Sequence, residues 1–159
     1  MDNDQGITPD SLEDVDTLVR AAFESSDECD LIHRLRKDND MANEIVLRGK
    51  EGLLGYAAIS RMVAPNGWLC LAPLAVAPGA QGRGHGTTVV GMVSKWAADR
   101  DATVVVLGDP DYYGARGFSA KRAAQLTTRY PVEYTLLAGP GDDAPQETLI
   151  YPPAFDRLS

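Results

Sequence analysis

The 159-residue chain has little cysteine and histidine and no long apolar run. Its two cysteines, Cys29 and Cys70, provide no disulfide framework, and no cysteines or histidines have the spacing of metal ligands. No stretch approaches the roughly 18 apolar residues that a membrane helix needs. The polar start, MDNDQGITPD, lacks the basic and apolar regions of a signal peptide. These absences predict a cytoplasmic protein with no metal site and no membrane partner.

Positive charge is also scarce, because the chain has 15 Lys and Arg residues against 23 Asp and Glu residues, which gives a net charge of −8. A nucleic-acid partner needs a basic face, so we expect none. A local nest for one small anion is still compatible with this charge. The acidity gives only a weak indication of a cationic substrate. Length and composition are those of an ordinary globular protein, so we expect one domain over residues 1–159.

The hydrophobic periodicity predicts alternating helices and strands from residue 11 onward. Ser11 is expected to cap the first helix. The predicted elements are helices over 12–23 and around 29–36, strands over 44–48, 53–63 and 68–76, a helix over 87–100, a strand over 103–107, one helical turn within 108–118, and weaker strands over 134–137 and 147–150. The strand–helix–strand unit over 68–107 should join parallel strands, whereas the earlier hairpins should be antiparallel. The predicted fold class is therefore α/β, with a mixed sheet and helices on its faces.

Three glycines, Gly82, Gly84 and Gly86, stand two residues apart between a predicted strand and a predicted helix, in GAQGRGHGTT. A Walker A loop would need a lysine after the glycines, and a Rossmann fingerprint would need glycine where Thr87 stands. The pattern Q-x-x-G-x-G fits, and it begins at Gln81. Such a turn exposes backbone N–H groups beside the positive end of a helix, which suits a diphosphate. A tight strand–helix junction is the structural alternative.

The stretch PLAVAPGAQGRGHG resembles motif A of the Gcn5-related N-acetyltransferases, the GNAT superfamily. VVVLGDPDYYGARGF is similar to their next strand and the FYxxxGF motif, and YPPAFDRL is similar to the tail of the YhbS-like bacterial subgroup. The resemblance implies a single-domain GNAT acyl-CoA N-acyltransferase fold, in which a mostly antiparallel sheet is splayed at a bulge. Because proline cannot donate to a sheet ladder, Pro73 belongs at such a bulge.

The resemblance also implies that acetyl-CoA is the co-substrate and lies in the gap between the splayed strands. His85 departs from the family pattern, which has Ile, Leu or Val there, so we expect it half exposed or near a phosphate. The implied cofactor-binding residues are Leu74, Ala75, Val76, Gln81, Gly82, Arg83, Gly84, His85, Gly86, Thr87 and Tyr113.

Tyr113 occupies the tyrosine position of the FYxxxGF motif, and the resemblance implies that it donates a proton to the leaving thiolate. A phenol with a pKa near 10 is protonated at neutral pH and can do so. Simple packing against CoA is the alternative role, and Tyr112 is expected in the core. A backbone N–H near Val76 is the implied donor to the carbonyl oxygen.

The residue that deprotonates the amine is left open. The candidates are Glu28, His33, Asp109 and Asp111, or a relay through water. Cys70 as an acetyl-carrying nucleophile is less favoured, because no histidine partner is nearby in sequence.

The sequence thus predicts an N-acetyltransferase that acts on a primary amine, in a small molecule or a peptide, by direct attack in a ternary complex. A non-catalytic acyl-CoA-binding sensor is the main alternative, since fold alone does not fix activity, and a nucleotide-binding α/β domain is a weaker one. The monomer and the homodimer are both left open.

Overall fold

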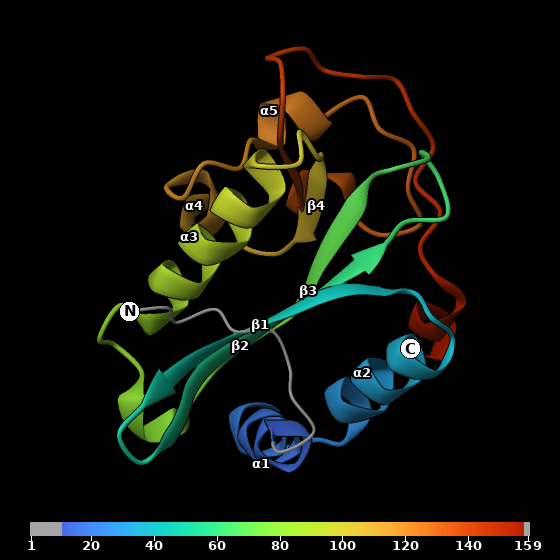
Figure 1. Ribbon diagram of the computed structural model, residues 1–159. Helices are drawn as coiled ribbons and strands as arrows, with labels where there is room; N and C mark the ends of the chain where they lie inside the picture. Colours follow the sequence, from blue (N-terminus) through green and yellow to red (C-terminus); the bar gives the residue numbers. More distant parts are fainter. Residues whose placement is uncertain (1–10, 158–159) are drawn as a thin grey trace.

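A five-stranded mixed sheet is the centre of the computed structural model, which describes residues 11–157 (Figure 1). The strands, in their order across the sheet, are β1 (Met41–Gly49), β2 (Gly52–Arg61), β3 (Leu69–Val76), β4 (Val104–Leu107) and β5 (Thr135–Ala138). All neighbours are antiparallel except β3 and β4, which are parallel and joined through a helix. The predicted mixed sheet is confirmed. The polar start at residues 1–10 and the last residue of the YPPAFDRL motif lie outside the described residues.

Helices cover both faces of the sheet, as predicted, with α3 on one face and α1 and α2 on the other (Figure 1). The helices are α1 (Leu12–Phe23), α2 (Asp27–Lys37), α3 (His85–Ala98), α4 (Pro110–Gly114) and α5 (Ala120–Ala123), with short 3-10 turns η2 (Pro78–Ala80), η3 (Val132–Tyr134) and η4 (Pro153–Arg157). Within residues 11–157, no helix has the length and apolar character needed to cross a membrane.

The core lies on both faces of the sheet, as the alternation of the strands requires. The α3 side buries Val89 and Val93 against strand residues such as Ile59. Gly55 lets the helix come close, because an added Cβ there would lie 2.7 Å from Val89 Cγ2. On the other face, α1 contributes Val15 to a second buried cluster. This packing fixes the start of α3 beside the end of β3.

Strands β3 and β4 separate part of the way along. Within the described residues they pair only at Leu69 with Val104, Cys70 with Val105, and Leu71 with Val106. On the other side of β3, Ile59 pairs with Leu71 and Ala57 pairs with Leu74, so Ala72 and Pro73 form a bulge. The position predicted for Pro73 is confirmed, and the β4-facing edge of β3 beyond the bulge borders a gap.

Several predicted boundaries were wrong. The segment 147–150 is not a sheet strand, because it lies beside loops and forms only isolated bridges, with Ile150 opposite Ala64 and Thr148 opposite Thr127. Helix α3 begins at His85 rather than at residue 87, immediately after Gly84. Ser11 does not cap α1 through its side chain; its hydroxyl accepts a hydrogen bond from Arg48 Nη2 at 2.7 Å.

Candidate functional site

A cavity of about 470 Å³ lies where the end of β3 meets the glycine turn and the start of α3. Phe23 of α1, Tyr112 of α4 and Arg116 complete its walls. Nine of the residues predicted to hold the cofactor line it: Leu74, Ala75, Val76, Gln81, Gly82, Gly84, His85, Gly86 and Thr87. The fold therefore brings together residues that the sequence places in a strand, a turn and a helix. His85 is half-buried there, as expected.

The turn is open to the cavity because of its glycines. Gly82 and Gly84 both have φ of +82°, a conformation that favours glycine, and an added Cβ at either position would meet nothing within 4 Å. Gly86 is needed for a different reason, since a Cβ there would lie 2.6 Å from Tyr112 Oη. The first N–H groups of α3 and the positive end of its dipole are at this turn. The turn therefore has the open backbone and the helix start that anion sites in proteins use.

The positive side chain of this cavity is Arg116. Its guanidinium lies over the ring of Tyr112, 3.6 Å from the centroid, and its Nε donates a hydrogen bond to Thr87 Oγ1 at 2.9 Å. Arg83 is exposed and is not among the lining residues. Sequence reasoning missed Arg116, although it lies in the quoted YYGARGF motif, because only the fold brings it to a turn far away in sequence.

A second cavity of about 310 Å³ adjoins the first, and Phe23 and Leu74 line both. Tyr113 lies in this second cavity. Its ring packs against Gly108 and makes edge-to-face contacts with Tyr112 and Phe118, with ring centroids 4.9 and 5.8 Å away. Burial, with a smaller contribution from Tyr112, raises the pKa of Tyr113 to about 12. Its hydroxyl is therefore protonated at neutral pH and available as a donor.

Of the four candidates for deprotonating the amine, only Glu28 lines the cavity that holds Tyr113. Its Oε1 is buried and has no hydrogen-bond partner within residues 11–157. Asp109 and Asp111 are exposed and line neither cavity, and Asp109 Oδ1 accepts a hydrogen bond from the Asp111 N–H at the start of α4.

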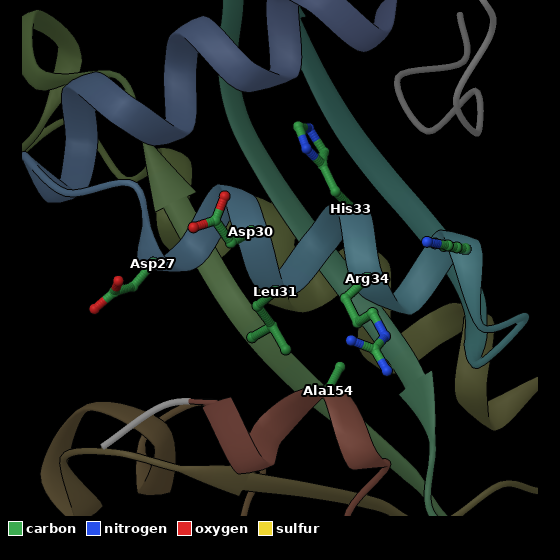
Figure 2. Close-up of a pocket in the computed structure, with 7 residues that line it drawn as sticks. Asp27, Asp30, Leu31, His33, Arg34 and Ala154 are labelled. Atoms are coloured by element: carbon green, nitrogen blue, oxygen red, sulfur yellow. The ribbon is translucent and has the colours of Figure 1, made fainter.

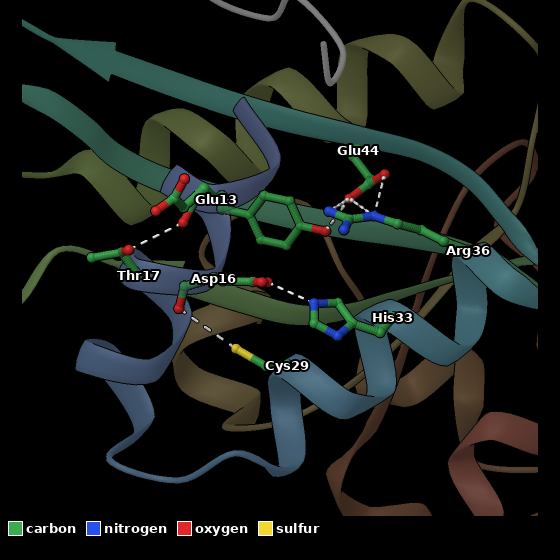
Figure 3. A network of polar contacts seen from close by, with 8 residues as sticks. Glu13, Asp16, Thr17, Cys29, His33, Arg36 and Glu44 are labelled. Atoms are coloured by element: carbon green, nitrogen blue, oxygen red, sulfur yellow. Dashed lines mark hydrogen bonds and ion pairs between the residues drawn. The ribbon is translucent and has the colours of Figure 1, made fainter. Parts of the chain in front are cut away.

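His33 is directed away from both cavities. It is one of the residues that line another hollow, which is formed by α2 and by Ala154 of the C-terminal turn (Figure 2). Its Nε2 lies 2.8 Å from Asp16 Oδ1, so it links α2 to α1 (Figure 3). The geometry gives His33 a structural contact and no access to the cavity of Tyr113.

Three further residues line the second cavity. Cys70 is buried, and burial raises its pKa to about 12, so its thiol is neutral and a poor nucleophile at neutral pH. Tyr130 and Tyr151 also line the cavity, and their buried hydroxyls form no close hydrogen bond in the described part of the chain, although the Thr128 side chain lies near Tyr151 and that of Arg129 near Tyr130. Sequence reasoning missed both tyrosines. Among residues 11–157, no three His, Cys, Asp or Glu side chains are grouped to hold a metal ion.

Strands β3 and β4 separate at a bulge, and a glycine turn precedes helix α3 beside them. This combination is that of the acyltransferase class which the sequence motifs resemble. The family model described as the acetyltransferase (GNAT) family matches residues 12–123. The chain therefore belongs to the GNAT acetyltransferase family. The predictions of the family, the fold and an acetyltransferase enzyme are confirmed.

Individual relatives agree with this assignment. The uncharacterized N-acetyltransferase YhbS of Escherichia coli K12 is 35% identical over 123 residues, which are 74% of this chain and 73% of the relative. A crystal structure of Escherichia coli YhbS in complex with CoA has a TM-score of 0.88 and 28% identity, and the match covers 100% of this chain and 96% of that one. A GNAT acetyltransferase from Brucella melitensis in complex with acetyl-CoA has a TM-score of 0.81 and 26% identity, with 96% of each chain covered.

Proposed function

We propose that this protein transfers an acetyl group from acetyl-CoA to a primary amine by direct attack within a ternary complex. The observation that carries the proposal is that the two cavities are neighbours. One holds the anion-binding glycine turn, the other holds Tyr113, and they share Phe23 and Leu74. The CoA and acetyl-CoA in the two solved relatives support the same choice of co-substrate.

The residues present fit acetyl-CoA. We assign the diphosphate to the glycine turn, where Arg116 adds a positive charge. We assign the pantetheine arm to the edge of β3 at Leu74, Ala75 and Val76, which pairs with β2 on one side and faces the gap on the other. Arg83 is a weaker candidate for a diphosphate contact, because its exposed side chain lies outside the cavity lining.

The reaction forms a carbon–nitrogen bond, breaks a carbon–sulfur bond and removes two protons from the amine. Acetyl-CoA supplies the acetyl group as a thioester. The amine loses one proton before its nitrogen bonds to the carbonyl carbon, and it loses a second as the carbon–sulfur bond breaks. One proton goes to the CoA sulfur, and we assign Tyr113 as its donor. The other is released, and a backbone N–H near Val76 stabilises the charge that develops on the carbonyl oxygen.

The proposal is tested by measuring CoA binding by calorimetry and the release of free thiol from acetyl-CoA with a panel of primary amines. We expect CoA to bind and at least one amine to yield thiol and an acetylated product. Binding of CoA with no thiol release from any amine would favour the non-catalytic sensor. Binding of ATP or NAD where CoA shows none would favour a nucleotide-binding domain instead.

A further inference from the structure

The second cavity has mostly apolar walls around very few polar atoms. Its apolar lining comes from α1 and α2, from β3 and β4, and from the C-terminal turn η4. The main apolar side chains are Phe23, Leu31, Leu71, Pro73, Leu107 and Phe155. At about 310 Å³, it is at the lower end of the roughly 300–1,000 Å³ typical of small-molecule sites. The cavity therefore suits a compact ligand with an apolar body.

Three polar atoms in this lining are buried and form no close hydrogen bond within residues 11–157: Glu28 Oε1, Tyr130 Oη and Tyr151 Oη. The side chain of Thr128 lies near Tyr151 and that of Arg129 lies near Tyr130, so Glu28 Oε1 is the clearest case. Tyr151 is only 6% exposed, and its ring meets the ring of Tyr130 edge to face at 5.0 Å. A buried polar group left without a partner destabilises the folded protein. Three such groups around one cavity indicate a ligand that supplies their partners.

The charge of the lining restricts that ligand further. Glu28 is the one carboxylate among the residues that line this cavity, and no lysine or arginine is present there. A single carboxylate in an apolar pocket matches a single ammonium group, whereas a polyamine or an aminoglycoside would bury further charges without partners. The acidic side chains Asp27 and Asp30 line the neighbouring hollow (Figure 2), which shares Leu31 with the second cavity, and not the second cavity itself.

We propose that the second cavity binds the acceptor, and that the acceptor is a primary amine carried on one compact apolar body, with its ammonium group against Glu28. This inference rests on the proposed acetyltransferase function and names its substrate class. Tyr130 and Tyr151 hydrogen-bond the amine or a polar atom close to it. Because Tyr113 lines the same cavity, the amine is held at the reacting end of the gap, and Glu28 is in place to take its first proton.

The experiment compares 2-phenylethylamine with spermidine and kanamycin as acceptors, using the full chain and acetyl-CoA. We expect kcat/KM for 2-phenylethylamine to exceed the other two at least about tenfold. Glu28→Gln should lower that value about 10- to 100-fold, the loss expected for one charged hydrogen bond, with CoA affinity unchanged. Asp30→Asn is the matched control, because it removes an exposed carboxylate of the same helix outside the cavity.

Tyr151→Phe gives a second test that does not depend on losing a charge. The Oη of Tyr151 forms no close hydrogen bond in the described residues and has only the Thr128 side chain near it, so this variant should change the melting temperature little while it weakens the use of 2-phenylethylamine several-fold. Greater activity with spermidine or kanamycin, or an unchanged kcat/KM in Glu28→Gln, would overturn this inference and leave the acetyltransferase function intact.

If no amine releases thiol, the proposed function fails. The binding of 2-phenylethylamine to the second cavity then decides the inference. Saturation-transfer NMR then measures the contact of 2-phenylethylamine with the CoA-loaded or CoA-free protein. A signal that is lost in Glu28→Gln and kept in Asp30→Asn supports binding of the amine in the second cavity. The absence of a signal in the unaltered protein overturns it.

Discussion

The guanidinium of Arg116 lies over the ring of Tyr112, with Cζ 3.6 Å from the ring centroid. The stacking and the hydrogen bond to Thr87 hold a positive charge at the edge of the glycine turn. Arg116 Nη1 also donates a hydrogen bond to the carbonyl oxygen of Tyr112 at 2.5 Å, and the other N–H groups of the guanidinium are available to an anion. The first cavity thus combines backbone donors with one fixed cation.

Arg116→Gln should weaken CoA binding about 10- to 100-fold, because it removes one charge-assisted contact to the diphosphate. Calorimetry with CoA measures the change. Arg100→Gln is the matched control, because Arg100 stacks on Trp96 at 4.2 Å and donates to its carbonyl oxygen, at the other end of α3 from the turn. Equal losses in the two variants would contradict a role of Arg116 at the diphosphate.

Gly84→Ala should cost about 1–2 kcal/mol of stability and weaken CoA binding about tenfold. Gly84 has φ of +82°, which a residue with a Cβ adopts at that cost, and the new methyl group would stand in the opening of the turn. Gly91→Ala is the opposite control: Gly91 lies inside α3 with open space around an added Cβ, so the change should stabilise the protein by about 0.5–1 kcal/mol. Thermal unfolding and CoA titration of both variants test the contrast.

Tyr113→Phe should lower kcat about 10²–10⁴-fold and leave CoA affinity nearly intact, because it removes the proton donor and keeps the packed ring. The contacts with Gly108 and Phe118 involve only the ring, so the variant should fold normally. Tyr134→Phe, at an exposed tyrosine, serves as the control. An unchanged kcat in Tyr113→Phe would mean that Tyr113 only packs at the site.

The parts of this protein that the sequence predicted well are those with a local signal. The apolar runs of β1 and β2, the turn between them and the glycine spacing after β3 belong to single short segments, and the crossover from β3 to β4 follows from chirality. The cavity at the glycine turn follows from these elements, because the helix start must lie beside the strand end.

The remaining parts depend on contacts between distant segments. Glu28 and His33 lie on the same short helix, and only the packing of α2 turns one toward a cavity and the other toward α1. Tyr130 and Tyr151 come from the C-terminal third, where the local signals are weak. The segment 147–150 has a strand-like pattern, but its neighbours are loops, so propensity alone predicted a strand that the tertiary structure does not form.

Glu44→Gln should destabilise the protein by roughly 3 kcal/mol, because it breaks a mostly buried ion pair and leaves Arg36 without a counter-charge. Glu44 Oε1 accepts hydrogen bonds from Arg36 Nη2 at 2.6 Å and from Tyr56 Oη at 2.7 Å, and so joins α2 to the sheet (Figure 3). Asp99→Asn breaks the exposed pair with Lys95 and should cost at most about 0.5 kcal/mol. Urea denaturation of both variants measures the difference, and similar costs would show that the Glu44 network contributes no more than a surface pair.

Stability should fall as the pH rises above about 9. Burial raises the pKa of Cys70 to about 12 from an unfolded value near 9.0, and it raises the pKa of Tyr56 well above 10.0, with a further increase from Glu44. Above about pH 9 for Cys70 and above about pH 10 for Tyr56, the unfolded chain has released a proton that the folded chain still holds, so each group then lowers the free energy of unfolding by about 1.4 kcal/mol per pH unit.

Below about pH 8 both states hold these protons, and the two groups add no pH dependence. Urea denaturation at pH 7, 9 and 10.5 measures the decline, and Cys70→Ala should make it shallower even though the lost side chain lowers stability at pH 7. A decline of the same slope in Cys70→Ala would contradict the raised pKa of this thiol.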